Sequence, residues 1–184
     1  METRHLVRIA LFAALLAVLG LFPAFNLPFV AGVPITMQTL GVMLAGVLLG
    51  ARYGTAAICL FIAVVLLGAP LLAGGRGGIG VLAGPTAGFL IGWIPGVAVT
   101  GWVMARLVRL PVLWAAIVAS IVGGIVVVYA LGIAWLAFSA KLSLQQAALG
   151  SLLFVPGDLI KAVAAGCVAE ATRRLQPSLF VRQH

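Results

Sequence analysis

Apolar runs that approach or reach membrane-spanning length follow one another along the chain, and they limit the fold more than any other feature. In hydrocarbon, every backbone N–H and C=O must be bonded within the protein, so such runs cross a membrane as helices. The chain is 64% hydrophobic and only 8% charged, whereas soluble domains have about 25% charged residues. The sequence therefore predicts one all-α membrane domain over residues 1–184, with six transmembrane helices at about 6–22, 36–50, 54–69, 85–107, 112–136 and 150–174.

Two of the connections have unusual compositions. Residues 23–37 contain Pro23, Pro28 and Pro34, so they cannot form a regular helix, and we expect a Pro-rich outer loop that covers the protein as a lid. Residues 74–84 hold six glycines, which predicts an outer loop whose bare backbone approaches a ligand closely. Arg52 and Tyr53 are expected to form a short turn, and residues 137–149 a polar connection.

The positive charges predict the orientation in the membrane. The net charge is +8, but the basic residues stand singly or in pairs at the ends of apolar runs, which argues against a nucleic-acid partner. Arg76 and Lys141 fall on one side. On the other side fall Arg4, Arg8, Arg52, Arg106, Arg109, Arg173, Arg174 and Arg182. The positive-inside rule then places both termini in the cytoplasm. We expect a multi-pass protein within the lipid bilayer of the cell membrane.

Asp158 and Lys161 lie inside the last apolar run. Each costs about 2.5–3.5 kcal/mol at a helix centre, and charges kept at such positions usually face a cavity or a partner. Three residues apart on a helix, they share one face and offer an acceptor-only carboxylate and a donor-only ammonium. We expect the pair to hold a polar small molecule; the alternative is an ion pair that merely orders the helix. Pro156 and Gly157 either start or break this helix just before Asp158.

Other candidate residues carry weaker signals. Arg76 is a basic residue in the outer glycine loop, and Gln38 at the start of the second helix either caps that helix or contacts a ligand. Ala10 and Ala14 form a small-xxx-small step in the first helix, which serves either internal packing or the docking of another subunit. Tyr129 lies in the fifth apolar run, where an anchoring or core role is favoured over cavity lining.

Several kinds of chemistry lack the residues they need. The sequence has no G-x-x-x-x-G-K-[ST] motif, so the chain itself does not bind ATP through a P-loop. His5 and His184 lie at the two ends of the chain and offer no membrane-embedded catalytic or metal site. Twelve helical residues separate Asp158 from Glu170, about 18 Å, which is too far for a catalytic carboxylate pair. No catalytic or metal-binding residues are therefore assigned.

Three motifs resemble those of one transporter family. They are VPITMQTLGVMLAGVLLGARYG (33–54), AGGRGGIGVLAGPTAGFLIGW (73–93) and VPGDLIKA (155–162). Together they resemble the BioY family, the biotin-specific substrate-binding component of energy-coupling-factor transporters. The resemblance implies high-affinity biotin binding and uptake without a cofactor, together with a transmembrane coupling subunit and two ATPase subunits that alone use ATP. It also implies that Asp158, Lys161, Arg76 and Gln38 contact the ligand, and that Ala10 and Ala14 belong to the docking motif.

Three other functions remain open. The same scaffold serves substrate components for other small vitamins. An intramembrane enzyme built on the Asp158–Lys161 pair is a different class, but a second acid or a histidine near the pair is missing. A structural protein packed through its glycine ridges leaves the two embedded charges unexplained.

Overall fold

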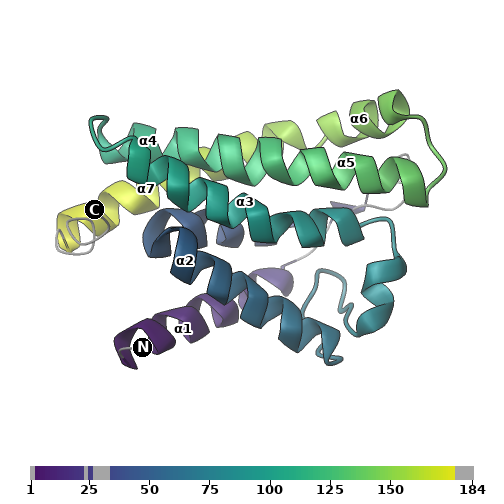
Figure 1. Cartoon of the computed structure of the whole chain (residues 1–184), viewed down its shortest axis with the longest axis horizontal. Coiled ribbons are helices and arrows are strands. Elements are labelled where there is room, and N and C mark those ends of the chain that lie inside the picture. The colour runs from purple at the N-terminus through teal and green to yellow at the C-terminus, as the bar shows by residue number, and fades with distance from the viewer. Residues whose placement is uncertain (1–2, 23–24, 27–33, 177–184) are drawn as a thin grey trace.

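The computed structural model describes residues 3–22, 25–26 and 34–176, which are almost entirely helical (Figure 1). Among them the only strands are two of two residues each, paired antiparallel. The elements in chain order are α1 (Thr3–Gly20), β1 (Phe25–Asn26), β2 (Pro34–Ile35), α2 (Gln38–Leu66), η1 (Ile79–Ala83), α3 (Ala87–Arg106), α4 (Val112–Ala119), η2 (Ser120–Val127), α5 (Val128–Ser139), α6 (Leu144–Leu152) and α7 (Val155–Leu175).

The helices α2 and α3 meet where α2 changes direction. Gly50 has φ 76° and ψ 177°, so α2 consists of two helices joined at this residue. A positive φ of this kind favours glycine because it has no Cβ. A Cβ on Gly101 of α3 would collide with the backbone of Ala51, so a second glycine lets the turn pack against α3. The expected turn at Arg52 and Tyr53 is therefore wrong by a few residues, since both lie inside the second half of α2.

The membrane-spanning segments confirm the expected fold class. The helices α1, α2 and α3 and the continuous stretch Val112–Ser139 are each long and apolar enough to cross a membrane. The bent pair α6 and α7, which meet at 53°, passes the same test together. With α2 counted as two helices, six helical segments form the bundle.

The stretch expected to be a polar connection, residues 137–149, instead ends in a further helix. Ser143 caps α6: its hydroxyl accepts from the Gln146 N–H, and the Gln146 side chain accepts from the Ser143 N–H. This reciprocal capping box satisfies two N–H groups at the start of the helix, which explains why these polar residues form a helix instead of a loop. Next, α7 begins at Val155, so Pro156 and Gly157 start the last helix rather than break it.

Glycines on one face of α3 allow close packing against the Val112–Ser139 stretch. A Cβ on Gly88 would overlap the side chain of Trp135, and one on Gly96 would lie 2.6 Å from the Val128 side chain. A Cβ on Gly92 would lie 3.2 Å from the Val128 carbonyl oxygen. These glycines thus form a tight helix–helix contact, as small residues provide in lipid.

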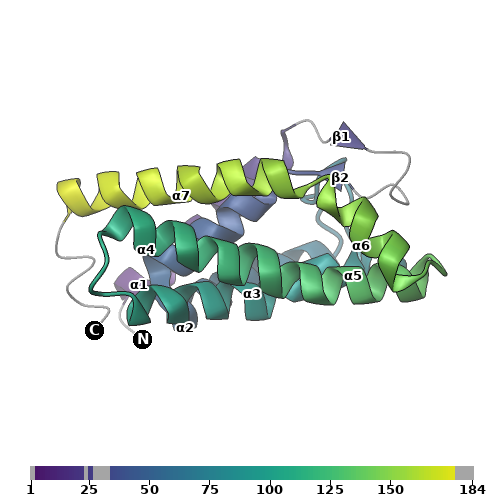
Figure 2. The same ribbon diagram turned by 90° about the horizontal axis from the view of Figure 1, so that it is seen from above.

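The two ends of the bundle differ in composition. The start of α1 and the end of α7 lie at one end, and the glycine-rich segment that follows α2 lies at the other, together with β1 and β2 (Figures 1 and 2). Most of the expected lid, residues 23–37, lies outside the described residues; only its two short strands and residues 36–37, which lead into α2, are described. The segment with Arg76 and the α5–α6 connection with Lys141 share the glycine-rich end. The α3–α4 connection and the end of α7, with their arginines, lie at the same end as the start of α1. For the described residues in these segments, the division matches the predicted distribution of charge; Arg182 lies outside the described residues.

Candidate ligand-binding site

A cavity lies at the glycine-rich end of the bundle, between the starts of α2, α3 and α7 and the middle of the fifth span. Its volume is about 80 Å³, several times the roughly 10–15 Å³ that admits one water. Part of its wall is apolar and aromatic, formed by Leu72, Phe89, Leu90, Trp93, Val128 and Phe154. A chamber with such a wall and a few convergent polar groups is the usual form of a small-molecule site.

Asp158 and Lys161 face each other at the floor of this cavity. They project from the first two turns of α7, and only 4% of Asp158 and 7% of Lys161 is exposed. Lys161 Nζ lies 2.8 Å from Asp158 Oδ1. The pair that the sequence singled out is therefore buried beside a cavity, in the surroundings that tolerate charge within a membrane.

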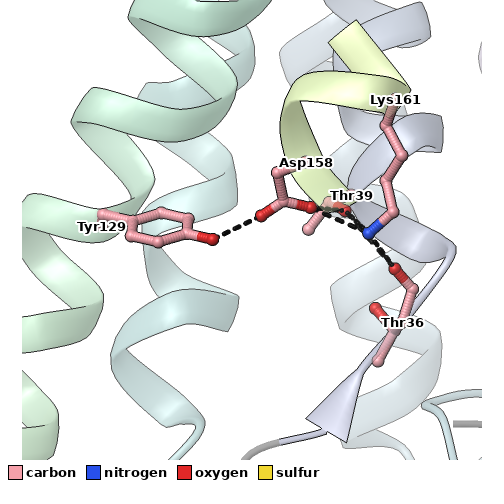
Figure 3. Close-up of polar contacts among 5 residues, drawn as sticks. All are labelled: Thr36, Thr39, Tyr129, Asp158 and Lys161. Carbon is pink, nitrogen blue, oxygen red and sulfur yellow. Dashed lines mark hydrogen bonds and ion pairs between the residues drawn. The ribbon is translucent and has the colours of Figure 1, made fainter. Parts of the chain in front are cut away.

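Lys161 uses all three of its N–H donors within the protein. They go to Asp158 Oδ1, to the hydroxyl of Thr39 at 2.9 Å and to the backbone carbonyl of Thr36 at 2.6 Å (Figure 3). An ammonium has three donors and no acceptor. A ligand that bonds to Lys161 must therefore replace one of these contacts.

Asp158 still has room for one more donor. Its Oδ1 accepts from Lys161 and from the Thr39 hydroxyl at 3.0 Å, and its Oδ2 accepts from the Tyr129 hydroxyl at 2.5 Å (Figure 3). Each carboxylate oxygen has two acceptor positions, so one position on Oδ2 has no protein donor among the described residues. The carboxylate is thus held by three donors and keeps one acceptor site beside the cavity.

Tyr129 is a site residue for which the sequence favoured an anchoring or core role over cavity lining. It is buried, lines the cavity and packs edge-on against Phe89, with ring centroids 5.9 Å apart. The π-helix η2 ends two residues before it. Each turn of a π-helix takes up extra residues compared with an α-helix and so changes which face the following side chains occupy. A tyrosine in an apolar run gives no sign of this change of register.

Gln38 lines the cavity, but the polar atoms of its side chain form hydrogen bonds with the protein backbone. Its Nε2 donates to the carbonyls of Leu16 in α1, at 3.2 Å, and of Leu71, at 3.0 Å. Its Oε1 accepts from the Ala73 N–H at 3.2 Å. The side chain is 1% exposed. Gln38 thus ties α1 and the start of the glycine-rich segment to α2, and in this arrangement it positions the cavity wall.

Arg76 reaches the cavity from the glycine-rich segment. Its Nε donates to the Ala73 carbonyl and its Nη1 to the Thr86 hydroxyl, both at 3.2 Å. These bonds use two of its five N–H donors, and among the described residues no carboxylate pairs with it. Burial lowers the pKa of Arg76, because it disfavours the charged form. A ligand anion would supply the missing negative charge.

Ala10 and Ala14, the expected docking residues, both lie on the exposed side of α1. Leu11 between them is 63% exposed. Neither alanine approaches the cavity, since α1 contributes no residue to its lining. The exposed side chains leave this face of α1 available for contact with lipid or with another helix.

The helical bundle of long apolar helices is that of a multi-pass membrane protein, and the buried cavity with its few polar groups is a candidate small-molecule site near one end. Residues 1–178 match the BioY family, and the chain belongs to that family.

Named relatives cover nearly the whole chain. It is 49% identical to the biotin transporter BioY of Rhizobium etli, over 99% of this chain and 100% of the relative. It is 48% identical to the biotin transporter BioY of Rhodobacter capsulatus, over 97% of each chain. These relatives are named as transporters rather than as enzymes.

A solved structure shares the fold. It is the crystal structure at 2.1 Å of the S-component for biotin from an ECF-type ABC transporter, with a TM-score of 0.89 and 31% identity. The similarity covers 94% of this chain and 92% of the solved chain.

Proposed function

We propose that this chain binds biotin and acts, as a single membrane domain, as the substrate-specific component of an energy-coupling-factor transporter. The observation that carries the proposal is the buried Asp158–Lys161 pair beside an amphipathic cavity whose third charged residue, Arg76, has no carboxylate partner among the described residues. Biotin combines a ureido group, an apolar bicyclic ring and a carboxylate, so its chemistry matches these features. The names of the relatives support the same ligand.

The hydrogen-bonding capacity of the site favours one orientation of biotin. A ureido N–H donates to the remaining acceptor position of Asp158 Oδ2, and the ureido oxygen accepts from Lys161 once one of its protein contacts is released. The biotin carboxylate pairs with Arg76, whose free N–H groups suit a charge-assisted bond. Phe89 and Trp93 cover the apolar ring. Gln38 acts indirectly, through its hydrogen bonds to the segment that leads to Arg76.

We further infer the partners and the orientation in the membrane. The exposed Ala10 and Ala14 allow close approach of a helix from a transmembrane coupling subunit, and two ATPase subunits supply the energy, so the chain needs no cofactor. The positive-inside rule places the arginine-rich end and both termini in the cytoplasm. The cavity then opens towards the outside of the cell membrane, where the vitamin is captured.

Titration calorimetry of the detergent-purified protein tests the ligand. We expect one biotin to bind per chain, with no heat from riboflavin or thiamine. Asp158→Asn keeps the size of the side chain but removes its charge, and it should weaken biotin binding by about 10–100-fold, the value of one or two charge-assisted hydrogen bonds. Glu170→Gln, which neutralises the other acid of α7, is the matched control and should bind like the wild type. Binding of a different vitamin in place of biotin would assign the cavity to that vitamin.

A further inference from the structure

A second hollow lies at the opposite end of the bundle, where α4 begins and α7 ends. It measures about 420 Å³ and is lined by residues 110–114 together with Glu170, Arg173 and Arg174. The two helices lie side by side in both views of the fold (Figures 1 and 2). A Cβ on Gly166 of α7 would lie 2.9 Å from the Leu113 carbonyl of α4, so the helices are in close contact just below the hollow.

The hollow offers more positive charge than its own acid neutralises. Glu170 accepts from Arg173 Nε at 3.1 Å, from Arg173 Nη2 at 2.8 Å and from Arg174 Nε at 3.0 Å. One carboxylate thus faces two guanidinium groups. Two guanidinium groups have ten N–H donors between them, and these three bonds leave seven without a partner among the described residues.

The backbone at the start of α4 adds further donors. Pro111 caps this helix without a side-chain hydrogen bond. The first bond across the turn runs from the Ala115 N–H to the Pro111 carbonyl. The N–H groups of residues 112–114 therefore remain available, as is usual in a first helical turn, and the helix dipole adds partial positive charge there.

Exposed apolar side chains extend from the hollow along both helices. Trp114 is 57% exposed, and Val118, four residues further on the same face of α4, is 39% exposed. On α7, Val163 lies two turns before Glu170 on one face and is 49% exposed. A charged hollow next to two apolar helix faces matches a phospholipid, which has a charged headgroup and apolar chains. A free phosphate ion would contact only the charged hollow.

We propose that this hollow binds the phosphate group of an anionic phospholipid, whose acyl chains lie along the exposed faces of α4 and α7. Arg173 and Arg174 supply the charge, and the first turn of α4 supplies backbone donors. Basic pockets between transmembrane helices recognise anionic headgroups in this way. Glu170 holds Arg173 in place but competes with the lipid for both arginines.

Native mass spectrometry of the full chain, released from micelles doped with one lipid at a time, tests the site. The probes are dioleoyl phosphatidylglycerol, dioleoyl phosphatidylcholine and inorganic phosphate. We expect phosphatidylglycerol to stay bound in preference to phosphatidylcholine. The double variant Arg173→Gln/Arg174→Gln should lower phosphatidylglycerol binding about tenfold or more and leave phosphatidylcholine unchanged. Glu170→Gln should raise phosphatidylglycerol binding.

The matched control removes the same charge at the same end of the bundle. Arg4 and Arg8 are exposed on α1, and Arg4→Gln/Arg8→Gln should retain wild-type lipid binding. Equal binding of the two lipids, or an equal loss in both double variants, would overturn the proposal, because either result means attraction to the surface charge alone. Displacement of the lipid by millimolar phosphate would show that the site binds a free ion instead. Cooperative thermal unfolding checks that each variant is folded, and Arg174→Gln alone replaces the double variant if that one fails to fold.

Discussion

The two ends of α7 carry the same motif in opposite surroundings. Asp158 and Lys161 form an i, i+3 ion pair at 2.8 Å, and so do Glu170 and Arg173. In the first pair the side chains of the lysine and the acid are 9% and 5% exposed; in the second the corresponding values for the arginine and the acid are 46% and 19%. The two pairs therefore have the same sequence spacing and the same N–O distance, and they differ in how deeply they are buried.

Their bonding partners differ as well. Asp158 also accepts from Thr39 of α2 and from Tyr129 of α5, so the buried pair joins three helices. Among the described residues, Glu170 accepts side-chain hydrogen bonds only from Arg173 and Arg174, both within α7. A buried ion pair depends on such additional bonds to offset the loss of water, whereas an exposed pair is solvated whether it forms or not. The comparison predicts large effects at one end of the helix and small effects at the other.

The largest effect should follow from Asp158→Ala. The substitution leaves the Lys161 ammonium buried without its carboxylate, which typically costs about 3–5 kcal/mol of the free energy of unfolding. The double variant Asp158→Ala/Lys161→Met removes the stranded charge and should regain much of that loss. Denaturant unfolding in detergent measures the four members of this double-mutant cycle. An Asp158→Ala protein as stable as the wild type would show that the pair is solvated rather than buried.

A smaller and more selective effect is expected at Arg76, the third charged residue of the buried end. If Arg76 pairs with the biotin carboxylate, Arg76→Ala should weaken biotin binding about 10–100-fold, as expected for a charge-assisted contact. Binding of biotin methyl ester, which lacks the negative charge, should change little. Arg76→Lys should retain part of the biotin affinity. Equal losses of affinity for biotin and for its ester in calorimetry would contradict this pairing and would mean that Arg76 does not bind the carboxylate.

The sequence predicted the spans and the buried pair because both depend on local composition. Apolar runs define where helices cross, and two charges in the last run stand out against their neighbours. The capping box of α6 could also have been recognised in the sequence, since Ser143 and Gln146 have the required spacing. The polar composition of residues 137–149 nevertheless led us to expect a loop instead of a helix.

The remaining site residues depend on tertiary geometry. Tyr129 meets Asp158 across 29 residues of sequence, and Thr39 meets it across 119. The π-helix η2 changes the register just before Tyr129, and composition carries no signal for it. Gln38 was expected either to cap the second helix or to contact a ligand, but its three backbone partners come from α1 and from the segment after α2. Such contacts appear only when the helices are placed together.

The smallest effect should follow from Glu170→Gln at the exposed end. The amide keeps the shape of the side chain, and solvent already screens the charges that it faces. Biotin affinity should equal that of the wild type, because Glu170 does not line the cavity, and the unfolding midpoint should stay within the scatter of repeated measurements. The same calorimetry and unfolding experiments applied to Asp158→Asn provide the contrast. A comparable loss in both variants would mean that i, i+3 pairing along α7, rather than burial beside the cavity, controls ligand binding, and the distinction between the two ends of the helix would fail.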